Sequence, residues 1–97
     1  MTTDHMTEKA RSYRVHNEVA DALGQPRFHA YSHVHGPLEL RARRDIVMGD
    51  IKIGTGEAVR LVSTSNAGFR GIVAHVETPE GFAVWDVSLG AFDVVRP

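Results

Sequence analysis

The chain has 97 residues, 42% of them hydrophobic, and a formal net charge of −1 at pH 7. This length suits one domain with a modest core, and the near-zero charge excludes a global field that would attract nucleic acid or an anionic membrane. No cysteine is present, which excludes a disulfide framework, a thiol nucleophile and thiolate metal ligands.

The N-terminal stretch, residues 1–6, has neither the positive start nor the apolar run of a signal peptide, and no stretch of the chain approaches membrane-spanning length. We therefore expect a cytoplasmic protein without membrane contact, organised as a single domain over residues 1–97. Residues 1–6 are expected to form a disordered tail because they offer little to bury at a terminus.

An amphipathic helix is predicted over residues 7–24. Thr7 suits the N-cap, and Gly24 followed by Pro26 is the stop signal expected past a helix end. One helical face is apolar and is formed by Val15, Val19, Ala22 and Leu23. Two roles remain open for this narrow stripe: capping one end of a β barrel, or forming a dimer contact.

Residues 25–37 form a predicted loop in which three histidines and two aromatic side chains are crowded between prolines. In an extended strand His33 and His35 lie on the same face, so both imidazoles could reach one divalent cation such as zinc or nickel. The candidate metal ligands are His29, His33, His35 and Glu39. The alternative is that these are partly exposed loop histidines that pack beside Phe28 and Tyr31.

The segment 38–53 predicts three strands. Residues 38–43 alternate with period two, which places Leu38, Leu40 and Ala42 on one face. Residues 46–48 and 51–53 are two short apolar runs separated by Gly49-Asp50, a pair that suits a two-residue hairpin turn.

The stretch 54–97 contains four more strand-sized runs, at residues 57–62, 71–77, 82–87 and 93–96, rich in β-branched and aromatic residues. Residues 63–68 have a loop composition, and Thr78-Pro79-Glu80-Gly81 predicts a turn within a hairpin. The predicted fold is mainly β: an SH3-like small barrel of five or six short strands over residues 38–97, with one N-terminal amphipathic α-helix.

Part of this stretch resembles a known family. Gly54-x-Gly56-Glu57-x-Val59-Arg60, Gly71-x-Val73 and the run Thr78 to Val84 are similar to the SH3-like barrel of the plasmid-borne type II dihydrofolate reductases, and more loosely to KOW-type domains. The resemblance implies a small barrel, and for the reductases a tetramer whose central pore holds folate and NADPH. Where those enzymes carry their catalytic strand, this chain has Trp85-Asp86-Val87-Ser88.

A second candidate site is a basic face that carries aromatic side chains, as phosphates and single-stranded bases require. The candidate partner-binding residues are Arg41, Arg43, Lys52, Arg60, Phe69, Arg70 and Trp85. The alternative is a solvated face in which these cations alternate with acidic residues, while Trp85 and Phe82 are core or half-buried barrel residues.

Three functions follow from these patterns. The leading hypothesis is a noncatalytic binding module for a protein or a single-stranded nucleic acid, with no catalytic residue and no cofactor. The first alternative is an oligomeric reductase-like enzyme or ligand-binding pore, with NADPH near Lys52, Arg60 and Trp85 of a homo-oligomer. The second alternative is a zinc- or nickel-binding protein that uses the histidine-rich loop.

Overall fold

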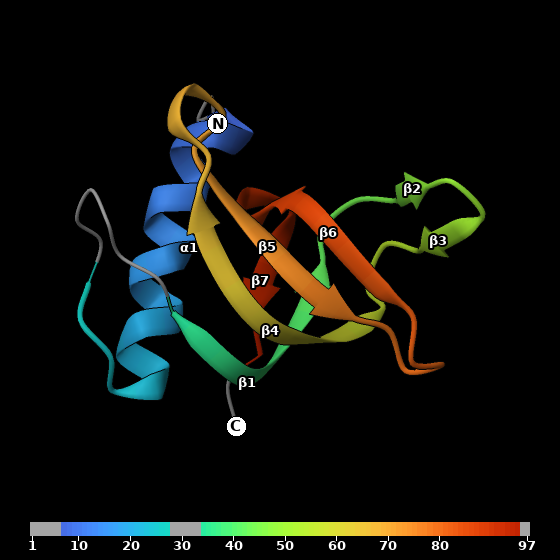
Figure 1. Cartoon of the computed structure of the whole chain (residues 1–97), viewed down its shortest axis with the longest axis horizontal. Coiled ribbons are helices and arrows are strands. Elements are labelled where there is room, and N and C mark those ends of the chain that lie inside the picture. Colours follow the sequence, from blue (N-terminus) through green and yellow to red (C-terminus); the bar gives the residue numbers. More distant parts are fainter. Residues whose placement is uncertain (1–6, 28–33, 96–97) are drawn as a thin grey trace, which may run out of the picture.

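A computed structural model of the chain describes residues 7–27 and 34–95. It is mainly β with one α-helix (Figure 1). None of the helices within these ranges is long and apolar enough to cross a membrane. The elements are α1 (Glu8–Leu23), β1 (His35–Ala42), β2 (Ile46–Met48), β3 (Ile51–Ile53), β4 (Ala58–Asn66), the 3-10 turn η1 (Gly68–Arg70), β5 (Ile72–Glu77), β6 (Ala83–Ser88), the 3-10 turn η2 (Leu89–Ala91) and β7 (Phe92–Val94).

Both predicted caps of the helix are confirmed. The Thr7 hydroxyl accepts a hydrogen bond from the Ala10 amide at 3.1 Å, which satisfies one of the free N–H groups at the start of α1. Gly24 ends the helix with a left-handed φ of 67°, and its amide donates to carbonyls of the last turn.

The predicted apolar stripe of α1 is partly wrong. Val15 and Val19 are buried as expected, but Ala22 is exposed and Ala20 takes its place. The buried stripe also includes polar side chains that hydrophobicity alone could not place there. It consists of Arg11, Ser12, Val15, His16, Val19 and Ala20. Arg11 and Ser12 are buried with hydrogen bonds to the Gly90 carbonyl and the Ile72 amide. Since this stripe is covered by η2, β5 and β7 of the same chain, the structure disfavours the dimer-contact alternative.

Five strands form an antiparallel sheet in the order β6-β5-β4-β1-β7. Within β1 the predicted alternation is confirmed, with Leu40 and Ala42 buried and Arg41 exposed. Two predicted loops are shorter than expected. β1 begins at His35, inside the predicted loop 25–37, and β4 extends to Asn66 because its polar residues lie on the solvent side while Thr64 is buried.

The sheet is strongly curved, and its register shifts in three strand pairs, β1–β4, β4–β5 and β5–β6. Such bulges bend a strand and increase its right-handed twist. Figure 1 shows the sheet wrapping from β6 to β7 with α1 along one side. In the described ranges β6 and β7 are the two outer strands of an open sheet, so the predicted SH3-like barrel is not confirmed.

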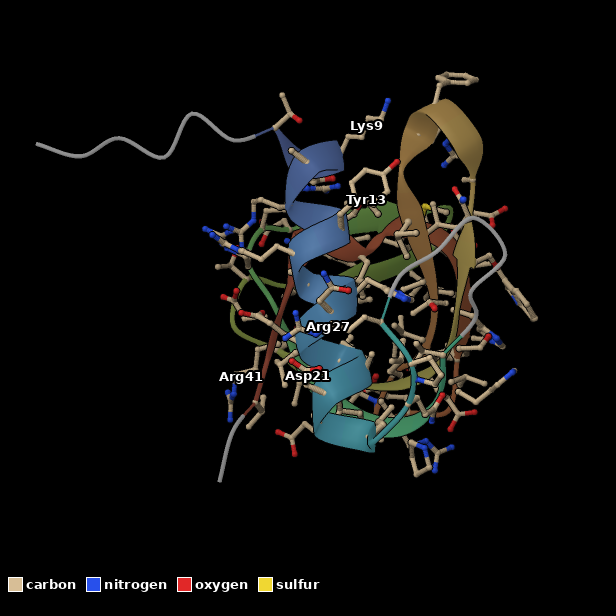
Figure 2. All side chains as sticks on the ribbon, turned by 90° about the vertical axis from the view of Figure 1, so that its left-hand side faces the viewer. Lys9, Tyr13, Asp21, Arg27 and Arg41 are labelled. Atoms are coloured by element: carbon tan, nitrogen blue, oxygen red, sulfur yellow. The ribbon has the colours of Figure 1, made fainter. Side chains whose placement is uncertain are left out.

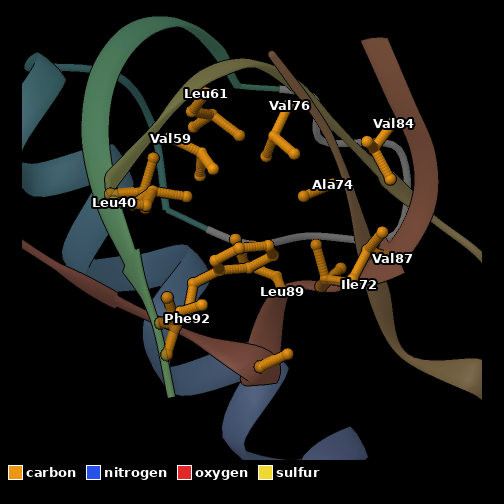
Figure 3. Packing of buried hydrophobic residues seen from close by; sticks show 14 of the residues in the cluster. Leu40, Val59, Leu61, Ile72, Ala74, Val76, Val84, Val87, Leu89 and Phe92 are labelled. Carbon is orange, nitrogen blue, oxygen red and sulfur yellow. The ribbon is translucent and has the colours of Figure 1, made fainter. Parts of the chain in front are cut away.

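The core lies inside this curve. Phe92 and Leu89 have no exposed surface, and Figure 3 shows them facing Val59, Leu61 and Val76 across the interior. The predicted hairpin with Gly49-Asp50 at its turn is confirmed as β2–β3, a separate two-stranded sheet. The predicted turn at residues 78–81 is confirmed by the bond from the Gly81 amide to the Thr78 carbonyl at 2.9 Å.

Candidate partner-binding surface

A bulge in the outer strand β6 turns an aromatic residue outward. Ala74 pairs with Val87 and Val76 pairs with Val84, so the single residue His75 lies opposite both Trp85 and Asp86. The extra residue lets Val84 and Val87 both be buried although they are three positions apart. Within the bulge, Asp86 adopts a left-handed φ of 58°, a conformation that Asp tolerates better than most residues. Trp85 and Asp86 are both exposed.

Trp85 stacks on the imidazole of His75 in the neighbouring strand. Their ring centroids are 3.4 Å apart and the rings are 16° from parallel. The indole nevertheless keeps 59% of its surface exposed. The alternative in which Trp85 is a core or half-buried barrel residue is therefore wrong. Stacking on His75 restricts the orientation of the indole.

The turn η1 lies beside this strand. Arg70 donates through Nη2 to the carbonyl oxygen of Asp86 at 3.1 Å, which ties the turn to the bulge. Phe69, the preceding residue, is 84% exposed. η1 is also held against the helix: Gly71 has a positive φ of 83°, and a Cβ there would lie 2.6 Å from the Ser12 hydroxyl.

A third exposed aromatic residue, Phe82, lies just before β6 and is 54% exposed. Its amide and carbonyl are both bonded to Thr78 in the preceding turn, so the backbone at Phe82 is fixed. The alternative in which Phe82 is a core or half-buried barrel residue is also wrong. We call the set Phe69, Arg70, His75, Phe82 and Trp85 the β6 surface.

The other predicted cations are not gathered at the β6 surface. Arg41 and Arg43 lie at the far side of the sheet, on and just after β1, Lys52 lies in the β2–β3 hairpin, and Arg60 lies in β4. Each faces a carboxylate: Arg41 faces Glu39, Arg43 faces Asp93, Lys52 faces Asp45, and Arg60 pairs with Glu77. Most of the predicted basic face is thus an exposed set of ion pairs distributed over several strands.

The Lys52 partner is held as an anion. The Thr55 amide and hydroxyl donate to the same oxygen of Asp45, at 2.8 and 2.9 Å. The hydrogen bond from the Thr55 amide is the main cause that keeps the pKa of Asp45 below its usual range. The Thr55 hydroxyl and the charge of Lys52 lower this pKa further, to a smaller extent. This lowers the free positive charge that Lys52 could offer to a phosphate.

A hollow with a volume of about 510 Å³ lies over β1, β4 and β5. Arg60 and Glu77 lie in its wall together with Glu39. Of the three residues proposed to surround NADPH, Arg60 lines this hollow and Lys52 and Trp85 do not. Because Arg60 is already paired with Glu77, the hollow offers no obvious excess of positive charge to a nucleotide.

The predicted metal site is half outside the described ranges, since His29 and His33 lie in residues 28–33. His35 and Glu39 both lie in β1, with an irregular register between them. Over residues 7–27 and 34–95, no group of three or more His, Asp or Glu side chains could hold a metal ion. The zinc or nickel site stays a prediction.

Comparison with known proteins adds no family. No family model, no curated protein and no solved structure matches the chain. The resemblance to type II dihydrofolate reductases and KOW-type domains therefore stays a prediction, and the function must be argued from the surface itself.

The sequence identified Phe69, Arg70 and Trp85 as binding candidates and did not single out His75, Asp86 or Phe82 for binding. One signal for the bulge is present in the chain. Val84 and Val87 are separated by three positions, whereas a regular strand buries residues two apart. That spacing indicates an inserted residue between them.

Proposed function

We propose that the chain is a noncatalytic small-barrel binding module, and that its partner is another protein, which it engages through the β6 surface. The observation that carries this proposal is the exposed Trp85 on an outer strand, held in place by His75. Tryptophan, tyrosine and arginine are the side chains that most often dominate the affinity of protein interfaces. Trp85 and Arg70 supply two of them, and Arg70 donates to the backbone carbonyl of Asp86, the residue after Trp85.

The place of Trp85 in the sheet favours an extended partner segment. β6 is paired on one side by β5 and is an outer strand of the sheet. An outer strand presents backbone N–H and C=O groups that a peptide can pair with, while alternate side chains enter neighbouring pockets or stack on exposed rings. Phe82 and Phe69, at the turns that flank β5, extend the apolar contact beyond Trp85.

Charge favours a protein over a nucleic acid. Single-strand binding combines stacking with a positive groove that follows several phosphates. Of the five predicted cations, Arg70 lies on the β6 surface and the other four face carboxylates elsewhere. Because each phosphate contact contributes to affinity through released counterions, a surface with one arginine supplies little of that term.

The strong curvature of the sheet supports the small-barrel part of the proposal. Its three register shifts bring β6 and β7 round a common core, as a small barrel requires. The curvature supports the proposed function because it packs one face of β6 on the core and leaves the other face open to a partner.

Site-specific photocrosslinking tests the proposal. p-Benzoylphenylalanine replaces Phe82 in one variant and Val47 in the control, since Val47 is 66% exposed in the β2–β3 hairpin away from the β6 surface. The expected result is one discrete protein adduct from position 82, mapped to a contiguous segment of the partner and lost when Trp85→Ala is added. Adducts that are equal at both positions, that consist of nucleic acid, or that join two copies of this chain would overturn it.

A further inference from the structure

Positive charges without an ion-pair partner meet at the turn η1, beside β6. Most lysine and arginine side chains in residues 7–27 and 34–95 face a carboxylate within 4.0 Å: Arg11, Arg27, Arg41, Arg43, Arg44, Lys52 and Arg60. Over the same ranges, Lys9, Arg14 and Arg70 form no ion pair. Lys9 and Arg70 both lie at η1.

Lys9 reaches η1 from the first turn of α1. A Cβ at Gly71, the residue after η1, would lie 3.0 Å from Lys9 Cγ, so the stem of Lys9 packs on the backbone at Gly71. Figure 2 shows Lys9 on the side of α1 that faces the turn between β4 and β5. Because Lys9 is exposed, its ammonium group stays in solvent beside the turn while its stem is held.

Arg70 keeps its charge although its position is fixed. Its Nη2 donates to the backbone carbonyl of Asp86 at 3.1 Å, and a carbonyl is a neutral acceptor. The Asp86 carboxylate is exposed and lies more than 4.0 Å from the guanidinium nitrogens, so it screens Arg70 only in part. Phe69, at the same turn, is 84% exposed. An apolar ring with two cations beside it is thus presented to solvent.

These charges lie at one end of the β6 surface. Phe82 precedes β6, Trp85 lies within it, and Arg70 joins η1 to the strand at Asp86. A segment that runs along β6 therefore passes Phe82 and Trp85 at one end and reaches η1 at the other.

We infer that the partner segment carries acidic side chains at the end that passes η1. This inference rests on the proposed function and names the chemistry of its partner. Carboxylates of the segment face Lys9 and the donors that Arg70 has left, while its apolar residues contact Trp85. Charge complementarity of this kind selects a partner and its orientation more than it adds affinity. A nucleic acid fits less well, because it needs cations that follow several phosphates along a groove.

Matched peptide mixtures test this inference by fluorescence polarisation. Each labelled mixture has a central stretch drawn from Val, Thr, Tyr and Ser, with a pair of Glu, Gln or Lys residues at one terminus or the other. At about 20 mM salt, a Glu-ended mixture should bind about five- to tenfold more tightly than its Gln-ended counterpart, and the Lys-ended mixture more weakly than both. At about 500 mM salt the Glu preference should fall below about twofold.

Charge variants assign the preference to η1. Lys9→Gln combined with Arg70→Gln should lower the ratio of the Gln-ended to the Glu-ended Kd to about one, and Asp86→Asn should raise it about twofold. Arg14→Gln is the matched control for Lys9→Gln and should leave the ratio unchanged. Arg14 is an exposed cation of the same helix without an ion pair, but it lies about 140° around α1 from Lys9.

The outcomes separate this inference from the proposed function. Equal affinity for Glu-ended and Gln-ended mixtures, or a preference that the double variant keeps, would overturn the acidic segment; weaker binding of every mixture by Trp85→Ala would then leave the proposed function standing. Absence of saturable binding, or binding that Trp85→Ala leaves unchanged, would overturn both. Tighter binding of oligothymidylate or of phosphatidylserine vesicles than of any peptide mixture would also overturn the acidic segment.

Discussion

At the scale of single residues, the backbone conformation of Asp86 determines which side of β6 Trp85 occupies. Its left-handed φ of 58° accommodates the bulge that exposes Trp85. Asp86 contributes its backbone carbonyl to Arg70, so a substitution of its side chain leaves that hydrogen bond in place. The side chain can therefore be varied to measure what the conformation costs.

We predict that Asp86→Gly stabilises the fold by about 0.5–1 kcal/mol and that Asp86→Val destabilises it by about 1–2 kcal/mol. Glycine adopts positive φ without steric cost, whereas a β-branched residue strongly resists it. Urea unfolding of the three proteins measures both differences. Equal stabilities of the Gly and Val variants would show that residue 86 does not hold the left-handed conformation.

At the scale of elements, α1 is joined to the sheet by a buried hydroxyl. Ser12 is fully buried. Its Oγ accepts a hydrogen bond from the Ile72 amide at 2.9 Å and donates one to the Lys9 carbonyl at 2.5 Å. Ser12 thus satisfies a backbone N–H at the start of β5 that would otherwise lack a partner in the core.

We predict that Ser12→Ala lowers the free energy of unfolding by about 1–3 kcal/mol, because it leaves the Ile72 amide buried without its acceptor. Ser65→Ala is the control, since Ser65 is exposed in β4, and should change stability by less than about 0.5 kcal/mol. Thermal or urea unfolding gives both values. A loss at Ser12 no larger than that at Ser65 would contradict the role of this contact.

The start of α1 is also fixed by the pair between Glu8 and Arg44. The hydrogen bond from Arg44 is the main cause that keeps the pKa of Glu8 below its ordinary value, against a smaller opposing effect of burial. A carboxyl group whose pKa is lowered on folding stabilises the protein at pH values above its unfolded pKa. That contribution is lost as the pH falls through the lower, folded pKa.

We therefore predict that Glu8→Gln lowers stability by about 0.5–1 kcal/mol at pH 7, and that the difference from the wild type shrinks below about pH 4. Urea unfolding at a series of pH values measures this. Arg44→Gln should give a similar loss, and the double variant should lose little more than either single one. A difference that stays constant down to pH 3 would refute the assignment to this ion pair.

At the scale of the whole molecule, caps and turns formed by adjacent residues were predictable from the sequence. Contacts between residues that are distant in the sequence were not. The Thr7 and Gly24 caps, the Gly49-Asp50 hairpin and the turn at residues 78–81 each depend on a few adjacent residues, and all are confirmed. The pairing of Arg60 with Glu77 and the meeting of Arg11 with Arg43 depend on strand register and helix packing. No local pattern encodes these, because the partners are distant in sequence.

The same contrast applies to the candidate surface. Composition indicated that Phe69, Arg70 and Trp85 belong together, and the hydrogen bond from Arg70 to the strand that carries Trp85 agrees with this. The sequence also grouped Arg41, Arg43, Lys52 and Arg60 with them, because outward alternation says which face a side chain occupies but not which strand is its neighbour. The strand order separates these cations from β6.

The most direct test of the central claim is the affinity of the partner segment identified by crosslinking, made as a synthetic peptide and titrated against the purified chain. Because Trp85 is the single tryptophan, its fluorescence reports binding in the wild type, and calorimetry gives Kd for every variant. We predict that Trp85→Ala raises Kd at least about 30-fold, as a hot-spot residue does, and that Val47→Ala changes it by less than about twofold. A folded Trp85→Ala protein that binds the segment as tightly as the wild type would contradict the proposed function.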